Sequence, residues 1–166
     1  MSSKPPANRL ILQYWQDTSP SDRLAHLVRD TARAYMRALQ NRLNDQGIPF
    51  SHWAFLRILW DVEGLTQREL SERAGVMEST TLIAIRSMQA KGYVERRQHV
   101  GNKKNRYVYL TKAGRSLQKK LVPLAEETNA VSQQTIADED IQTARRVLLQ
   151  ILTNLAEDDA LAHQAP

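Results

Sequence analysis

Apolar side chains recur at steps of three and four residues over most of the chain, which is the spacing of one face of a helix. From Ser21 the apolar positions continue to Leu43 with this period, and Gly47 and Pro49 follow them as helix terminators. A second stretch with the same period runs from about residue 51 to 62. The pattern therefore predicts two helices before the middle of the chain.

A helix-turn-helix pattern follows. Thr66 stands three residues before Glu69, the spacing of a capping box, and Gly75 suits the left-handed turn at the end of a short helix. Another predicted helix begins near Glu78 and ends before Gly92. On a helical projection its residues divide into one face with Thr81, Ile85 and Met88, which we expect in the core, and an opposite face with Ser79, Leu82, Ile83 and Arg86.

After this helix the period changes to strict alternation. Residues 93–97 and 106–110 each read as a short strand, and the segment between them, 99–105, reads as a basic loop. A hairpin with a basic tip directly behind a helix-turn-helix is a wing. The sequence thus predicts a mainly α fold with one small β-hairpin.

The two ends of the chain are helical outside this module. A loose arm with a short helix is expected over 1–20, and two long helices fill 112–158. Their apolar stripes are wide enough to need a partner, which is either the chain's own first helix or, as the favoured choice, a second subunit. We therefore predict a winged helix-turn-helix domain over 49–111 and a helical dimerisation region formed by 21–48 and 112–158.

Composition narrows the function classes. The 166 residues include no cysteine, which excludes disulfides, thiolate metal sites and thiol-based oxidant sensing. No apolar run approaches a membrane span, and the N-terminal apolar run is too short for a signal peptide, so a cytoplasmic protein is expected. From Thr66 to Lys120 the net charge is +9, whereas the rest of the chain carries −4. Such an asymmetry is typical of a module that binds a polyanion.

The order of elements and several local motifs resemble the MarR family of bacterial winged-helix regulators over roughly residues 21–155. The residues that support the resemblance are Trp53, Leu65–Leu70, Gly75–Val76, Ser79–Thr81, Lys91–Arg96 and Leu110–Gly114. The resemblance implies a homodimer that binds pseudo-palindromic operators in double-stranded DNA, usually as a repressor that a small molecule releases.

The chain departs from the family pattern in two places. The wing of the family usually has an Asp followed by paired arginines, whereas this chain has Asn102, Lys103 and Lys104 there, which puts an Asp–Arg brace of the wing in doubt. In the second helix of the motif, Leu82 and Ile83 stand where polar or basic side chains are common. They either contact thymine methyl groups or pack against the body of the protein.

Two sets of candidate site residues follow. The DNA-binding candidates are polar or basic residues of the motif and the wing, together with the two apolar residues: Gln67, Arg68, Ser79, Thr80, Leu82, Ile83, Arg86, Lys103, Lys104 and Arg106. The resemblance also implies an effector crevice between the dimer helices and the winged domain. Its candidates combine cations with aromatic walls, which suits a small aromatic effector such as a carboxylic acid: Arg23, His26, Arg29, Phe50, His52, Trp53 and Leu56.

The same residues also have structural interpretations: Arg86 and Arg29 as ion-pair partners and Trp53 as a core residue. The four histidines share no metal-ligand spacing, and no nucleophile or phosphate-loop motif is present, so neither a metal, nor a cofactor, nor an enzyme activity is expected. Two alternatives remain: a constitutive DNA-binding protein without an effector, and a helical protein-interaction module.

Overall fold

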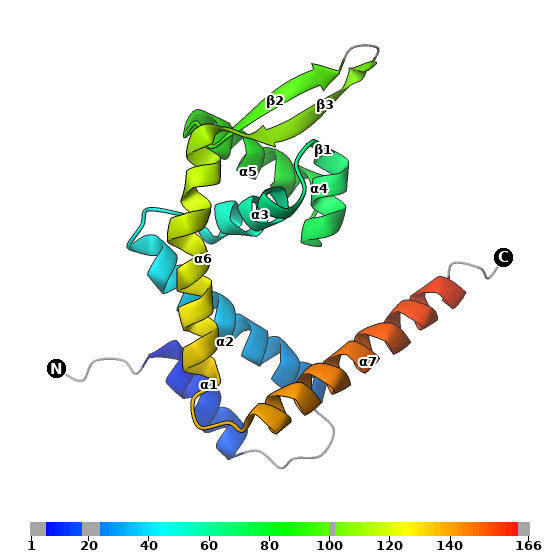
Figure 1. Cartoon of the computed structure of the whole chain (residues 1–166). Helices are drawn as coiled ribbons and strands as arrows, with labels where there is room; N and C mark the ends of the chain where they lie inside the picture. Colours follow the sequence, from blue (N-terminus) through cyan, green and yellow to red (C-terminus); the bar gives the residue numbers. More distant parts are fainter. Residues whose placement is uncertain (1–5, 18–23, 100–101, 163–166) are drawn as a thin grey trace. The chain divides into compact units, whose positions relative to one another are not determined.

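A computed structural model describes residues 6–17, 24–99 and 102–162 (Figure 1). The chain divides into two compact units, residues 1–128 and 129–166. In chain order the first unit begins with helices α1 (Ala7–Gln16), α2 (Leu24–Asn44) and α3 (Phe50–Asp61). The predicted short helix near the N-terminus is confirmed as α1. The predicted helix start at Ser21 lies outside the described residues.

The helix-turn-helix and the wing follow α3. Strand β1 (Leu65–Thr66) leads into α4 (Gln67–Ala74), and α5 (Glu78–Ala90) is followed by β2 (Val94–His99) and β3 (Asn102–Leu110). The three strands form one antiparallel sheet in the order β1-β3-β2, in which β2 and β3 run side by side as a hairpin (Figure 1). The mainly α fold with a small winged sheet is therefore confirmed. The third strand, β1, was not predicted.

The predicted loop over 99–105 is wrong in its extent. β3 already begins at Asn102, and His99 pairs with Asn102 across a register shift that follows Arg97. Backbone hydrogen bonds hold antiparallel strands together whatever their side chains are, so a polar hairpin can continue where hydrophobic alternation has ended. The hairpin is consequently longer than the sequence pattern indicated.

One hydrophobic core holds the first unit together. Its fully buried members come from α2, α3, α4, α5, β3 and α6 (Lys112–Ser132), and they include Leu43, Leu56, Leu59, Leu70, Ile85, Met88, Leu110 and Leu121. The helix-turn-helix is thus fixed to α2 and α6 by shared packing, and this packing sets the orientation of α5. The second unit contains α7 (Asp138–Ala162), whose first turn has three acidic residues that favour the positive end of the helix dipole.

Candidate nucleic-acid interface

Local hydrogen bonds define the start of α4. The Thr66 hydroxyl accepts from the Glu69 amide at 3.2 Å, and the Glu69 carboxylate accepts from the Thr66 amide at 2.7 Å, so the predicted capping box is confirmed. Hydrogen bonds from the backbone and then the side chain of Thr66 hold the pKa of Glu69 below its usual range. The helix ends at Gly75 in the left-handed conformation, with φ of 64°, as predicted. α4 is therefore a short, well-capped helix.

α5 has one buried and one exposed face, as its sequence predicted. Thr81, Ile85 and Met88 are fully buried, whereas Ser79, Thr80 and Arg86 are exposed. The side chain of Ile83 is 69% exposed, and Leu82 is half-buried. Leu82 therefore packs partly against the body of the protein, whereas Ile83 projects from the surface.

The beginnings of α4 and α5 are linked to each other. The Gln67 side-chain amide donates to the Glu78 carbonyl at 3.3 Å. Arg68 is exposed and pairs with Glu72 at 2.9 Å, and this hydrogen bond raises the pKa of its guanidinium. The exposed Arg68 pair contributes little to stability, so Arg68 can exchange its partner at small cost.

The wing places a third group of candidates beside these. On β3, Arg106 is exposed and shares a face with the buried residues Val108 and Leu110. Lys103 and Lys104 belong to β3 by their backbone, and their side chains lie outside the described part of the structure. Arg106 is therefore the wing candidate whose position the structure gives.

A cleft of about 500 Å³ separates the wing from the two helices. It brings together three of the predicted residues, Gln67, Arg68 and Arg106, from α4 and β3. It is also lined by Arg96 of β2, which was not among the candidates. The complete lining is Thr66, Gln67, Arg68, Glu78, Ile85, Arg96, Asn105, Arg106 and Val108. Three of these nine side chains are arginines, so the cleft is suited to an anion.

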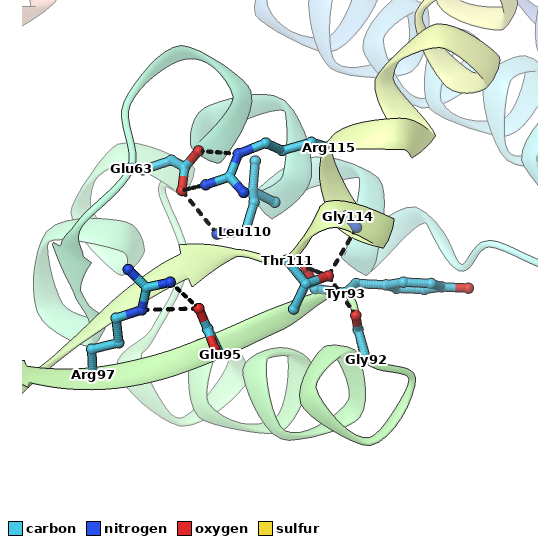
Figure 2. Close-up of polar contacts among 9 residues, drawn as sticks. All are labelled: Glu63, Gly92, Tyr93, Glu95, Arg97, Leu110, Thr111, Gly114 and Arg115. Atoms are coloured by element: carbon cyan, nitrogen blue, oxygen red, sulfur yellow. Dashed lines mark hydrogen bonds and ion pairs between the residues drawn. The ribbon is translucent and has the colours of Figure 1, made fainter.

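The base of the wing is anchored by polar contacts that Figure 2 shows. The Glu63 carboxylate accepts from the Leu110 amide at 3.1 Å and from two nitrogens of Arg115 at 2.9 and 2.7 Å. This bidentate pair joins the segment after α3 to the first turn of α6. A planar guanidinium and a carboxylate in this arrangement fix direction as well as distance.

A second joint lies on the other side of the wing base. The Thr111 hydroxyl donates to the Gly92 carbonyl at 2.6 Å and accepts from the Gly114 amide at 3.1 Å (Figure 2). The Trp60 indole donates to the Gly114 carbonyl at 3.0 Å. A Cβ on Gly114 would stand 2.1 Å from the Tyr93 carbonyl oxygen, so only glycine allows this approach. The wing is thus rigidly seated on α6.

On the outer face of the wing, Arg97 is satisfied by its neighbours. It pairs with Glu95 on the same strand (Figure 2), and its guanidinium lies 4.8 Å from the ring centre of Tyr109. Arg96 and Arg97 therefore point to opposite faces of the sheet and have different surroundings.

The effector candidates are distributed between surface and core. Arg23 lies outside the described residues, and His26 and Arg29 are exposed on α2. Arg29 pairs with Asp30 at 3.0 Å, and Asp30 also accepts from the indole of Trp15 at 3.3 Å.

The remaining effector candidates belong to α3. Leu56 is fully buried in the core, whereas Phe50 and Trp53 are half-buried. Trp53 makes an edge-on contact with Trp60, with 5.8 Å between ring centres.

His52 is a core residue as well. Only 1% of its surface is exposed, and its Nε2 lies 2.9 Å from the Ser87 hydroxyl on α5. Its Nδ1 is buried and has no hydrogen-bond partner in the part of the chain that the structure describes. Burial, with a smaller effect of Lys91, lowers the pKa of this imidazole, which therefore stays neutral near pH 7. The hydrogen bond with Ser87 joins His52 to α5, the second helix of the helix-turn-helix.

The described residues contain neither a metal-binding cluster nor a helix that could span a membrane. Within 6–17, 24–99 and 102–162 no group of three or more His, Asp or Glu side chains is placed to hold a metal ion. No helix in these ranges has the length and apolar content to cross a membrane.

Known proteins with similar sequences are transcriptional regulators. Residues 48–105 match the model of the MarR family. A curated relative, the HTH-type transcriptional regulator TtmR of Methylorubrum extorquens, is 25% identical over 92% of this chain and 76% of its own length.

Solved structures share the fold. A MarR-family transcriptional regulator from Listeria monocytogenes, complexed with a 26mer DNA, has a TM-score of 0.75 at 19% identity over 87% of this chain and 96% of its own. BpsR of Bordetella bronchiseptica, whose DNA binding is regulated by 6-hydroxynicotinic acid, has a TM-score of 0.70 at 17% identity over 81% of this chain and 97% of its own. The relatives are regulators rather than enzymes. With its capped helix-turn-helix, exposed α5 face and wing, the chain has the winged-helix fold of these regulators, and its residues 48–105 match the MarR family.

Proposed function

We propose that the chain acts as a homodimeric repressor that reads a pseudo-palindromic operator through α5. The observation that supports this most directly is the division of α5 into a buried face and an exposed one. The exposed residues near its beginning are free to reach base edges, as the second helix of a helix-turn-helix does. Phosphate contacts from Gln67, Arg68 and the wing, including Lys103, Lys104 and Arg106, would supply affinity.

Two copies are required because one α5 reads one half-site. Successive major grooves on one side of a duplex lie about 34 Å apart, so two recognition helices must be held at that spacing. Exposed apolar side chains outside the winged module are available for the contact between copies. They occur on three helices: Leu10 and Leu12 on α1, Leu24, Leu27, Val28 and Tyr35 on α2, and Val147, Leu148, Leu149, Leu152 and Leu155 on α7.

A small aromatic compound, with carboxylic acids as the first candidates, is the proposed releasing effector. The half-buried Phe50 and Trp53 offer aromatic surface, and His26, Arg29 and Arg23 offer positive charge. Regulation of BpsR by 6-hydroxynicotinic acid gives a precedent for this class in a protein of the same fold. His52 and Leu56 are buried in the core, so they could only support the groups that contact the effector. The effector shifts the equilibrium only as far as its affinities for the free and the DNA-bound dimer differ.

A gel shift on the DNA upstream of the chain's own gene tests the proposal. At low salt the protein should retard this duplex and not an equally long duplex of scrambled sequence. Benzoate or 6-hydroxynicotinic acid should weaken the complex and raise the melting temperature of the free protein. Failure to retard any duplex at low salt would disprove DNA binding. Binding that no aromatic acid alters would leave a constitutive DNA-binding protein.

A further inference from the structure

Arg96 on β2 is a cation on the inner face of the wing that was not among the predicted DNA-binding residues. Residues two apart on a strand share a face, so Arg96 lies on the same inward side of the sheet as the buried Val94, and its Cα partner on β3 is Val108. This is a core-facing position occupied by a permanent cation. Its side chain lines the cleft between the wing and the helix-turn-helix.

The guanidinium of Arg96 has unmet hydrogen-bonding capacity. Its Nε and Nη2 are shielded from solvent and have no hydrogen-bond partner among the described residues. Burial, together with the positive charges of Arg106 and Arg86, lowers the pKa of the group. Unsatisfied buried donors of a charged group are costly, and a structure retains them most readily where an acceptor arrives from outside.

The charges around the cleft indicate which acceptor this is. Arg68 and Arg106 line it with Arg96, and the acidic lining residue is Glu78. Arg68 is already paired with Glu72, and the described structure gives Arg96 no acidic partner. The net charge of the lining is therefore positive, and the free volume is large enough for a tetrahedral oxyanion.

We propose that Arg96, with Arg106 beside it, binds a backbone phosphate of DNA in the cleft between the wing and α4. This inference rests on the proposed DNA-binding function and adds a residue to it. When the guanidinium turns into the cleft about its side-chain torsions, two unmet donors are exchanged for phosphate oxygens. The wing is thereby held to the duplex from its inner face as well as from its tip.

The test compares Arg96→Gln with Arg97→Gln. Both variants remove one positive charge from adjacent positions of β2, but Arg97 faces outward and is paired with Glu95 and stacked on Tyr109. Binding to two duplexes of about 30 base pairs, one from the upstream region and one of scrambled sequence, is measured by fluorescence anisotropy from about 50 to 300 mM NaCl.

A lost phosphate contact has a defined signature. Arg96→Gln should weaken binding to both duplexes by about the same factor, roughly tenfold per chain near 0.1 M salt, and should lower the slope of log K against log salt by about one per chain. Arg97→Gln should change both quantities by clearly less. Because the substitution removes unmet donors, Arg96→Gln should melt at or above the temperature of the unaltered protein.

Several results would overturn the assignment. If the unaltered protein binds the duplexes and Arg96→Gln binds with the same affinity and salt slope, the inference is wrong while the DNA-binding function stands. A loss equal to that of Arg97→Gln would show a general charge effect. A fall in melting temperature of more than about 5 °C in Arg96→Gln would show that Arg96 stabilises the wing instead.

A second measurement separates DNA phosphate from a free anion. Sodium phosphate is added to the protein without DNA, with sodium chloride of equal ionic strength as the reference, and the melting temperature is recorded. A rise that Arg96→Gln abolishes supports an oxyanion site. If that rise occurs but the salt slope for DNA is unchanged in the variant, the cleft takes free phosphate and its assignment to DNA fails.

Discussion

Gly114 provides the sharpest test of how the wing is seated on α6. Its missing side chain allows the first turn of α6 to approach the Tyr93 carbonyl, where a Cβ would stand at 2.1 Å from the oxygen and 3.0 Å from the carbonyl carbon. Real Cβ atoms require about 3.4 Å for ordinary contact, so Gly114→Ala demands a movement of about 1.3 Å between two backbone segments. Neither segment is free to move by that amount.

The expected loss of stability follows from the contacts at this joint. The joint contains two hydrogen bonds from Thr111: its amide donates to the Tyr93 carbonyl at 3.0 Å, and its hydroxyl donates to the Gly92 carbonyl at 2.6 Å. Loss of these two hydrogen bonds corresponds to about 1–3 kcal/mol, and the strain of overpacking adds about 1–3 kcal/mol. The better helix propensity of alanine returns about 1 kcal/mol. The net expectation is a destabilisation of about 1–5 kcal/mol.

Chemical denaturation checks this value. Urea unfolding of Gly114→Ala is compared with that of the unaltered protein and of Ala113→Gly, an exposed neighbour in the same turn, for which we expect a loss of about 0.5–1 kcal/mol. All three are measured at one protein concentration, because association of two copies would make the apparent stability depend on concentration. Unfolding free energies of Gly114→Ala and unaltered protein that agree within about 0.5 kcal/mol would refute the reasoning.

Three further predictions concern other parts of the first unit. The pKa of His52 is lowered in the folded protein, so below about pH 6.5 the unfolded chain binds more protons than the folded one. The free energy of unfolding should therefore decrease there by up to about 1.4 kcal/mol per pH unit, and melting curves of His52→Gln should depend less on pH. Glu63→Ala should lower the unfolding free energy by about 1–3 kcal/mol, because it leaves the Leu110 amide and Arg115 without their acceptor, whereas Glu72→Ala at an exposed pair should change it by less than about 1 kcal/mol. Ile83→Ala should leave the melting temperature nearly unchanged and weaken binding to a selected operator about threefold to tenfold, and equal binding by the two proteins would show that Ile83 touches no base.

The features that could be predicted from the sequence are those that depend on residues close together in the chain. The capping box at Thr66, the left-handed Gly75 and the buried face of α5 are all short-range patterns, and all are confirmed. A face of α5 can be recognised because three buried residues repeat at helical spacing. Signals of this kind need no knowledge of the rest of the fold.

Long-range partners account for what the sequence did not predict. β1 consists of two residues and exists because Leu65 and Thr66 pair with Val108 and Tyr107, more than forty positions later. The burial of His52 likewise depends on its contact with Ser87 on another helix. His52 and Leu56 resembled ligand contacts in the sequence because aromatic and apolar residues compose pocket walls and cores alike.

The two arginines of β2 show the same limitation at the candidate site. Alternation predicts that Arg96 and Arg97 face opposite sides of the sheet, but it does not tell which of them faces the helices. That choice depends on Val94, which enters the core, and on β3, whose Val108 and Leu110 cover the same side. Only the assembled sheet shows that two nitrogens of the inward arginine, Nε and Nη2 of Arg96, have no acceptor among the described residues.

The charge of the inner face of the wing depends on the same arrangement. Arg96 lines the cleft with Arg68 and Arg106, and the acidic residue of the lining is Glu78. An acidic partner of Arg96 would satisfy the guanidinium permanently and would offset one positive charge there, but the described structure gives Arg96 no such partner. The cleft therefore retains a positive charge, and the Nε and Nη2 donors of Arg96 stay available to an anion that arrives from outside, as the proposed phosphate contact requires.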